Sequence, residues 1–210
     1  LDKNKKLIKT FSTKAKEKED KIDVNAGMNQ FVWNMLYAPA ERVEGQIIWH
    51  GTVPGPKAAP GQYFYKIKAE KDSVEGSFNI KANPVYNVSQ QDYEDQFNFL
   101  ISIRDKFNDI QKAGKNIRDI RKQINDFMDK QGKDVPTEIK QQADTINKQM
   151  TVIEEALHQT KAKIGQDVLN FPIQLDDKLS SLYRAAGAGQ SAPSAQAKAA
   201  YAELSVLIDI

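Results

Sequence analysis

The sequence predicts two domains of different class: a small antiparallel β-sandwich of immunoglobulin or fibronectin type, followed by an antiparallel helical bundle. Before Pro84, apolar residues alternate in short runs broken by Gly and Pro, as in Tyr63, Tyr65 and Ile67. This period of two is typical of half-buried strands. After Pro84, apolar residues recur every three or four positions for more than a hundred residues, as in amphipathic helices. We therefore expect the sandwich over residues 1–84 and the bundle over residues 85–210.

Composition fits two folded domains. The chain has 210 residues, of which 40% are hydrophobic and 9% aromatic, enough for real cores. Its 30 basic and 28 acidic residues leave a net charge of +2. Such a balance argues against a nucleic-acid partner, which normally selects a strong basic excess.

Other features of the sequence exclude further classes. With no cysteine, the chain has no disulfides and no thiolate metal sites. No run approaches the roughly 18 apolar residues that cross a bilayer, so we predict no membrane span. The chain opens Leu1-Asp2-Lys3, without an initiator Met or a signal-like apolar segment. We therefore expect a piece of a larger protein.

The first predicted domain contains several short strands. Leu7, Ile8 and Phe11 fall in a plausible first strand, and 28–36 alternates so that Asn29, Phe31, Trp33 and Met35 would face the core. A shorter apolar run covers 46–50. The strand over 62–70 places Tyr63, Tyr65, Ile67 and Ala69 on one side, and a turn at Asp72-Ser73 leads to a return strand over 76–82.

The second predicted domain contains four helices, at about 89–130, 136–164, 174–186 and 194–210. Ser89 followed by Asp92 is a good helix start, and Ser194 caps the last helix. The second helix has nearly faultless 4-3 spacing of apolar residues through Ile164, which indicates a long helical hairpin. At Gly114, inside the first helix, we expect a close helix contact or a slight bend.

No residue pattern supports a catalytic, cofactor or metal site. His50 and His158 have no second His or carboxylate at the spacing of zinc ligands. Glycosidase chemistry needs two acids held in one cleft. Adjacent acids on a helix, such as Asp176-Asp177, point to different sides, so we expect them on solvated helix surfaces.

The aromatic residues of the first domain allow two interpretations. They could fill the sandwich core or pack on a neighbouring domain, which is the favoured reading. They could instead form a platform on which sugar rings stack. The residues concerned are Phe31, Trp33, Trp49, Tyr63 and Tyr65.

Three segments resemble a known type of domain. The run 1–11 (LDKNKKLIKTF) resembles the first strand pair of FlgD-type immunoglobulin-like domains. The run 26–34 (AGMNQFVWN) is similar to their glycine-led Gly-x-Asn-x-Phe-x-Trp-Asp strand, and 59–67 is similar to their Pro-Gly-x-Tyr strand. Followed by Asn83-Pro84 and a long helical region, this order resembles the C-terminal part of secreted bacterial proteins with BNR/Asp-box, sortilin-like β-propellers. Such proteins are often labelled glycosyl hydrolases and are frequent in Bacteroidetes.

The resemblance implies an accessory role. The chain would brace an upstream β-propeller of its parent protein and offer a docking surface to it or to another protein, in the periplasm or at the cell surface. No Asp-box (Ser-x-Asp-x-Gly-x-x-Trp) occurs, so the family's catalytic residues have no counterpart here. Asn34 and Asn83 also stand where the family usually has Asp. A carbohydrate-binding module that uses the aromatic residues above remains the alternative.

Overall fold

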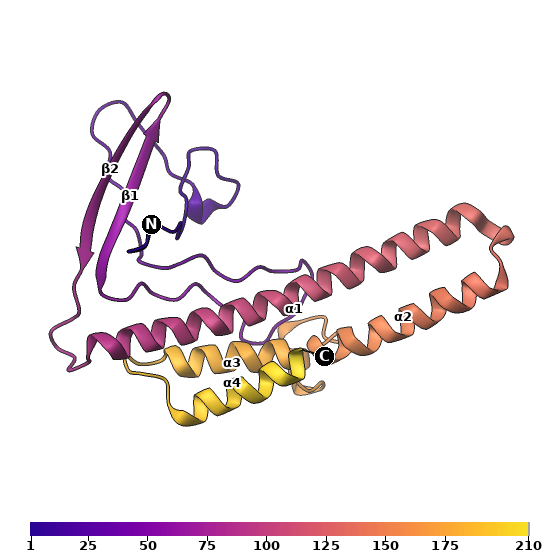
Figure 1. Ribbon diagram of the computed structural model, residues 1–210. Helices are drawn as coiled ribbons and strands as arrows, with labels where there is room; N and C mark the ends of the chain where they lie inside the picture. Colours follow the sequence, from indigo (N-terminus) through magenta and orange to yellow (C-terminus); the bar gives the residue numbers. More distant parts are fainter. Residues whose placement is uncertain (210) are drawn as a thin grey trace.

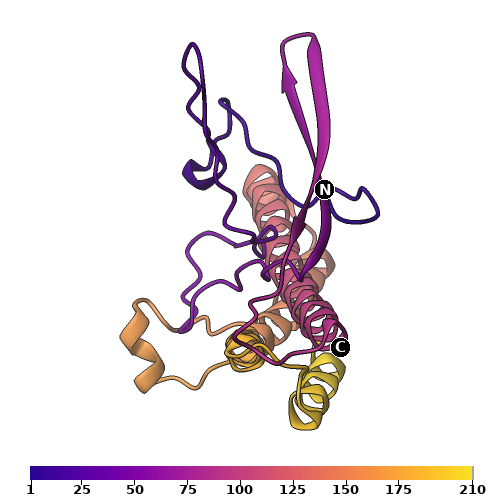
Figure 2. The same ribbon diagram turned by 90° about the vertical axis from the view of Figure 1, so that its left-hand side faces the viewer.

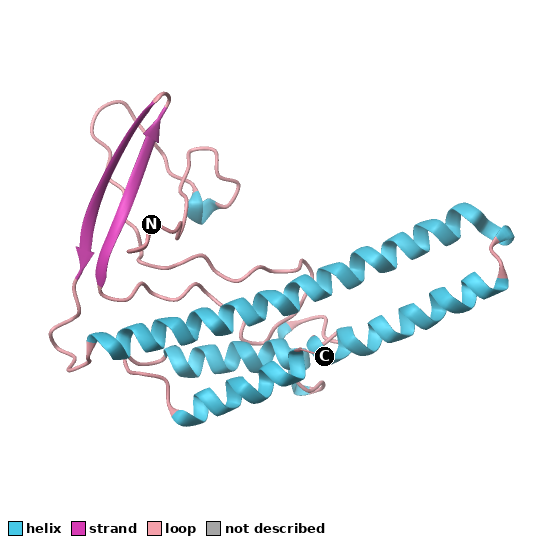
Figure 3. Ribbon diagram, viewed as in Figure 1, coloured by secondary structure: helices cyan, strands magenta, loops and turns pink. Residues whose placement is uncertain are grey.

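The computed structural model describes residues 1–209, and the side chains of all of them except Glu19 and Lys133. This part of the chain forms one β-hairpin and four α-helices, joined by irregular segments and three short 3₁₀ turns (Figures 1 and 3). The hairpin strands are β1 (Gly61–Ala69) and β2 (Asp72–Ile80); the helices are α1 (Gln90–Gln131), α2 (Thr137–Leu157), α3 (Leu175–Gly187) and α4 (Ala195–Ile208); the 3₁₀ turns are η1 (Lys18–Asp20), η2 (Gly132–Asp134) and η3 (Gly165–Leu169).

The predicted β-sandwich is wrong. Within residues 1–209 the only sheet has two strands, β1 and β2. The strands expected over 28–36 and 46–50, and the one around Leu7 to Phe11, are irregular segments. The isolated bridges of this region join Leu36 to Lys57 and, just after the first of these segments, Ser12 to Lys21. Phe31, expected to face the core, is more than half exposed.

Residues 37–53, here called the strap, show why no second sheet forms. The strap lies along α1, where helix side chains bond its peptide groups. The N–H of Glu41 donates to Asn108 Oδ1 (2.7 Å) and that of Val43 to Gln111 Oε1 (3.0 Å). Buried peptide groups must find partners, but a helix side chain serves as well as a neighbouring strand. The apolar run over 46–50 therefore did not indicate a strand.

The hairpin keeps the predicted alternation with a different turn. Its register pairs Tyr63 with Phe78 and Ile67 with Val74, so these residues share one face. The loop is Glu70-Lys71, whereas the Asp72-Ser73 turn expected from the sequence lies inside β2. Glu70 takes a positive φ of 51°, as a tight two-residue connection requires. The hairpin rises from the start of α1, beside the N-terminal segment (Figures 1 and 2).

Helix α1 is continuous over 42 residues. Ser89 caps it: the Ser89 hydroxyl accepts the N–H of Asp92, and the Asp92 carboxylate accepts the N–H of Ser89. The close contact expected at Gly114 is made by the strap rather than by a helix. A side chain at Gly114 would come within 3.2 Å of Gln46 Nε2.

The remaining helices pack along two different stretches of α1. Figure 1 shows α3 and α4 beside its first half, while α2 runs back along its second half to form a projecting hairpin. Helix α2 ends at Leu157, short of the predicted end at residue 164, and the chain turns through an irregular connector to α3. Ser194 caps α4 through the N–H of Ala197.

The main core lies where α1, α3 and the strap meet. Phe107 and Ile103 of α1 are fully buried against Leu179 of α3 and Val53 of the strap. Part of α4 covers this cluster from the other side through Tyr201. A second, smaller cluster at the base of the hairpin surrounds Tyr63. None of the helices in residues 1–209 combines the length and apolar character needed to cross a membrane.

Candidate functional site

A buried pair of ionisable side chains joins the end of α2 to the start of α3. His158 is the first residue after α2, and its N–H donates to Glu154 O (2.8 Å). Its Nδ1 lies 2.5 Å from Asp176 Oδ2 in the first turn of α3, where an acid is favoured by the free N–H groups of the helix. The two side chains are 6% and 0% exposed. They hold the two helix ends together across the connector.

A second acid extends this cluster to the strap. The other Asp176 oxygen accepts the N–H of Asp177 (2.7 Å), and Asp177 Oδ1 accepts the N–H of His50 (3.4 Å). Burial, and then the neighbouring charge of Asp176, raise the pKa of Asp177 above its ordinary value of 3.8. Arg184 donates to the backbone carbonyl of His50. His50 thus joins the cluster through its peptide groups.

The structure corrects the expectation that Asp176-Asp177 lies on a solvated surface. The two residues are 0% and 1% exposed. They are buried because the chain leaves the helical path at His158 and returns as α3, so that both acids face the end of α2 and the strap. No local signal shows this. The prediction that α2 continues to residue 164 would have kept His158 away from Asp176.

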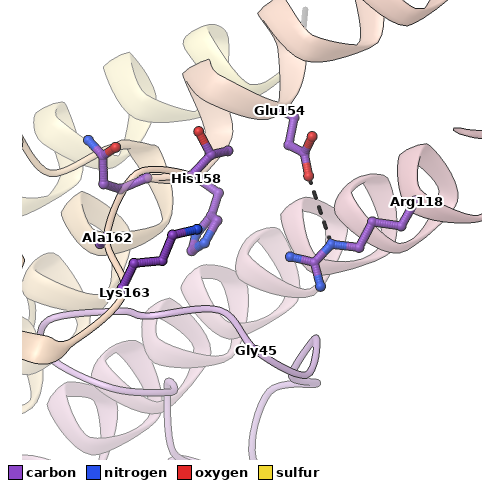
Figure 4. Close-up of a pocket in the computed structure, with 8 residues that line it drawn as sticks. Gly45, Arg118, Glu154, His158, Ala162 and Lys163 are labelled. Carbon is purple, nitrogen blue, oxygen red and sulfur yellow. Dashed lines mark ion pairs between the residues drawn. The ribbon is translucent and has the colours of Figure 1, made fainter.

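A pocket of about 270 Å³ opens beside this pair (Figure 4). Arg118 of α1 and Glu154 of α2 line one side, with 3.8 Å between Arg118 Nε and Glu154 Oε1. His158 and Lys163 line the other, and Figure 4 shows the Lys163 side chain pointing toward the His158 ring. The pocket is therefore polar and mainly cationic.

The wall that carries Lys163 is a structured turn. The N–H groups of Lys163 and Ile164 both donate to Asp167 Oδ2, at 2.6 and 3.0 Å. These backbone hydrogen bonds hold the pKa of Asp167 below its ordinary value. Gln159 Nε2 donates to Pro172 O (2.7 Å) and closes the connector from the other end. The position of Lys163 is thus set by several bonds of the connector itself.

The His158–Asp176 pair resembles part of an arrangement that is used in acid–base catalysis. A carboxylate that orients a histidine occurs in acid–base catalysis, where the histidine activates a hydroxyl or thiol. In residues 1–209 no such nucleophile is hydrogen-bonded to His158. In the same region no three His, Cys, Asp or Glu side chains are grouped to hold a metal ion.

The five aromatic residues singled out from the sequence are dispersed. Trp33 packs edge-on against Tyr63 with ring centres 6.0 Å apart, and its Nε1 donates to Leu36 O (3.0 Å). Tyr63 is buried in the small cluster, where burial raises the pKa of its hydroxyl. These two residues form packing contacts at the base of the hairpin.

The other three are more exposed but lie apart. Phe31 packs on Phe11 with ring centres 4.6 Å apart. Tyr65 lies across the hairpin over Gly76, where any side chain would collide with its ring. Trp49 is in the strap, beside His50 and α3. The structure brings together Trp33 and Tyr63, but not all five residues.

Comparison with models of protein families, with curated proteins and with solved structures finds no match to this chain. The resemblance to FlgD-type domains therefore rests on the residues quoted for it.

Proposed function

We propose that this chain is a non-catalytic accessory module, which docks through the apolar face of the β1–β2 hairpin onto another folded domain. The resemblance points to an upstream β-propeller of the same parent protein as that domain, and to a periplasmic or cell-surface location. In this proposal the helices form the rigid base from which the hairpin projects.

The graded exposure of the hairpin carries the proposal. On its apolar face, exposure rises from 7% at Tyr63 to 43% at Tyr65 and 61% at Ile67, whose partner Val74 is 62% exposed. The N-terminal segment covers the base of the hairpin and leaves the outer half open. Exposed apolar patches on folded proteins mark interaction sites more often than single scattered residues do.

The stability of a hairpin supports the same conclusion. A two-stranded sheet by itself is only marginally stable in water and needs packing against another element. Here the base has that packing through Trp33 and Tyr63, while Ile67 and Val74 in the outer half are 61% and 62% exposed. Burial of Ile67 and Val74 by a partner would contribute about 25 cal/mol for each Å² of apolar area removed from water.

The test is binding between this chain and the domain encoded upstream of it. Ile67→Lys places a charge on the apolar face and is expected to weaken the complex at least about tenfold, measured by isothermal titration calorimetry. Ser77→Lys is the matched control, because Ser77 pairs with Phe64 on the opposite face. Equal affinities for the two variants, or a gene with no propeller-sized region upstream, would refute the proposal. So would turnover of a glycoside by the purified chain.

Carbohydrate binding remains the second hypothesis, and the exposed ring of Tyr65 is the observation in its favour. A glycan-array signal that is lost in Tyr65→Ala, with the fold intact, would favour sugar stacking over docking.

A further inference from the structure

The pocket between α1 and the α2–α3 connector has a charge balance that points to a ligand. Its acid, Glu154, is neutralised within the protein: Arg121 Nη1 lies 2.8 Å from Glu154 Oε2, and Arg118 Nε lies 3.8 Å from Oε1. Two arginines thus share one carboxylate. Because Arg121 is the closer partner of Glu154 and lies outside the lining, the charge of Arg118 is not fully offset even before Lys163 is considered.

Lys163 adds a further cation, whose charge interacts with that of Asp167 in the same turn. Among the described residues, its ammonium group makes no ion pair and no hydrogen bond, although Figure 4 shows it pointing toward His158. The imidazole uses Nδ1 for Asp176, so only its other nitrogen is open to a ligand. Arg118 donates through Nη1 to Glu44 O (2.8 Å) and its Nε lies 3.8 Å from Glu154 Oε1, but its Nη2 has no partner among the described residues. Lys163 and the free side of Arg118 therefore both present donors to the pocket.

We propose that this pocket binds a small oxyanion, a phosphate or carboxylate group, between Lys163 and Arg118. Charge-assisted hydrogen bonds from lysine and arginine to such groups are among the strongest in proteins. The volume of about 270 Å³ is several times the roughly 30 Å³ share of one water molecule, so the oxyanion can belong to a somewhat larger molecule.

The site is independent of the proposed docking surface. It lies where α2 meets α3, whereas the hairpin rises from the start of α1 (Figure 1). Loss of either function would leave the other unchanged, so the two proposals fail separately.

The experiment is a titration of the full 210-residue chain with inorganic phosphate at constant ionic strength, followed by amide NMR signals, with acetate in a parallel arm. We expect a saturable shift of the signals of residues 158–163. Lys163→Gln is expected to weaken phosphate binding about tenfold, because one charge-assisted contact is lost. Lys161→Gln is the matched control: Lys161 is exposed on the same connector but does not line the pocket.

The possible outcomes distinguish a specific oxyanion site from nonspecific ion binding. Saturation by phosphate alone identifies a phosphate site, and saturation by acetate as well identifies a general oxyanion site; both support the proposal if Lys163→Gln weakens binding and Lys161→Gln does not. Shifts spread over the lysine-rich stretch 3–21, or equal affinities for the two variants, would show an adventitious ion only and would overturn it.

Discussion

Helix α1 and the strap lie against each other along the molecule, yet they satisfy their backbone groups in opposite ways. The helix bonds its peptide groups within itself and presents side chains to its surroundings. The strap has no regular structure over residues 37–53, and α1 side chains supply several of its hydrogen bonds. The order of the strap therefore depends on the helix, whereas α1 does not need the strap to form its own hydrogen bonds.

This difference predicts where each region is sensitive to mutation. The helices should respond most to lost side-chain packing, and the strap to the few places where backbone passes close to backbone or bonds to α1. Both regions share Phe107 and Val53 in the main core. A change there should destabilise them together.

The largest effect is expected for Phe107→Ala. Phe107 is fully buried between α1, α3 and the strap, so the variant loses its packing and leaves a cavity. We expect the free energy of unfolding to fall by about 3–5 kcal/mol, measured by urea denaturation. Phe127→Ala, at a half-exposed position on the projecting end of α1, is the control and should cost much less. Equal losses would contradict the role given to Phe107 in the main core.

Gly55→Ala tests the close backbone approach beside the strap. A methyl group at Gly55 would overlap the carbonyl of Tyr37, which is main chain and cannot rotate away. We expect a loss of about 1–3 kcal/mol of unfolding free energy in thermal or urea denaturation. Gly165→Ala, where the added methyl group meets nothing within 4 Å, should be nearly neutral. If Gly55→Ala leaves the free energy of unfolding unchanged, the backbone at Gly55 does not pack closely against the Tyr37 carbonyl.

Gln111→Leu tests the bonds between the strap and α1. It removes the acceptor of the Val43 N–H, while the buried Gln111 Nε2, which has no partner among the described residues, disappears as well. A net loss of about 1 kcal/mol is expected, together with faster amide exchange at Val43. Gln123→Leu, at an exposed position of the same helix, should leave that exchange unchanged. Unchanged exchange in both variants would contradict the role given to Gln111.

The smallest effect concerns the dependence of stability on pH at Asp177. Because the folded-state pKa of Asp177 is raised, the folded protein binds this proton more tightly than the unfolded chain does. Its contribution to stability is complete below the ordinary pKa of 3.8 and is lost as pH rises through the raised value. Asp177→Asn keeps an oxygen acceptor for His50 but does not titrate there. The melting temperature of Asp177→Asn minus that of the parent chain should therefore increase between about pH 3.5 and pH 7. If this difference stays constant with pH, the prediction is wrong.

The structure of the helices could be predicted from the sequence better than that of the N-terminal region. Ser89 with Asp92, the 3.6-residue period and Ser194 are local signals, and the structure places helix starts next to both serines. The alternation around Tyr63 correctly indicated a hairpin strand. The same alternation over 28–36 gave a wrong prediction of a strand. A period of two shows only that a segment is extended, and not that a second strand lies beside it.

The candidate site was not visible in the sequence. His158 and Asp176 are 18 residues apart, and their pairing depends on the end of α2 at Leu157. One usable signal was missed: Arg104, Asn108, Gln111 and Arg118 form a polar row at helical spacing beside the apolar face of α1, and all four bond to the strap.

Local chain chemistry was thus sufficient to determine the capped helices, the long amphipathic face of α1 and the hairpin, because caps, turns and periodicity act over a few residues. Only the tertiary structure decided that the first 60 residues form no sandwich and that Asp176 is buried against His158. These outcomes depend on which distant groups meet, since a peptide N–H or a carboxylate can be satisfied equally well by a strand, a helix side chain or water.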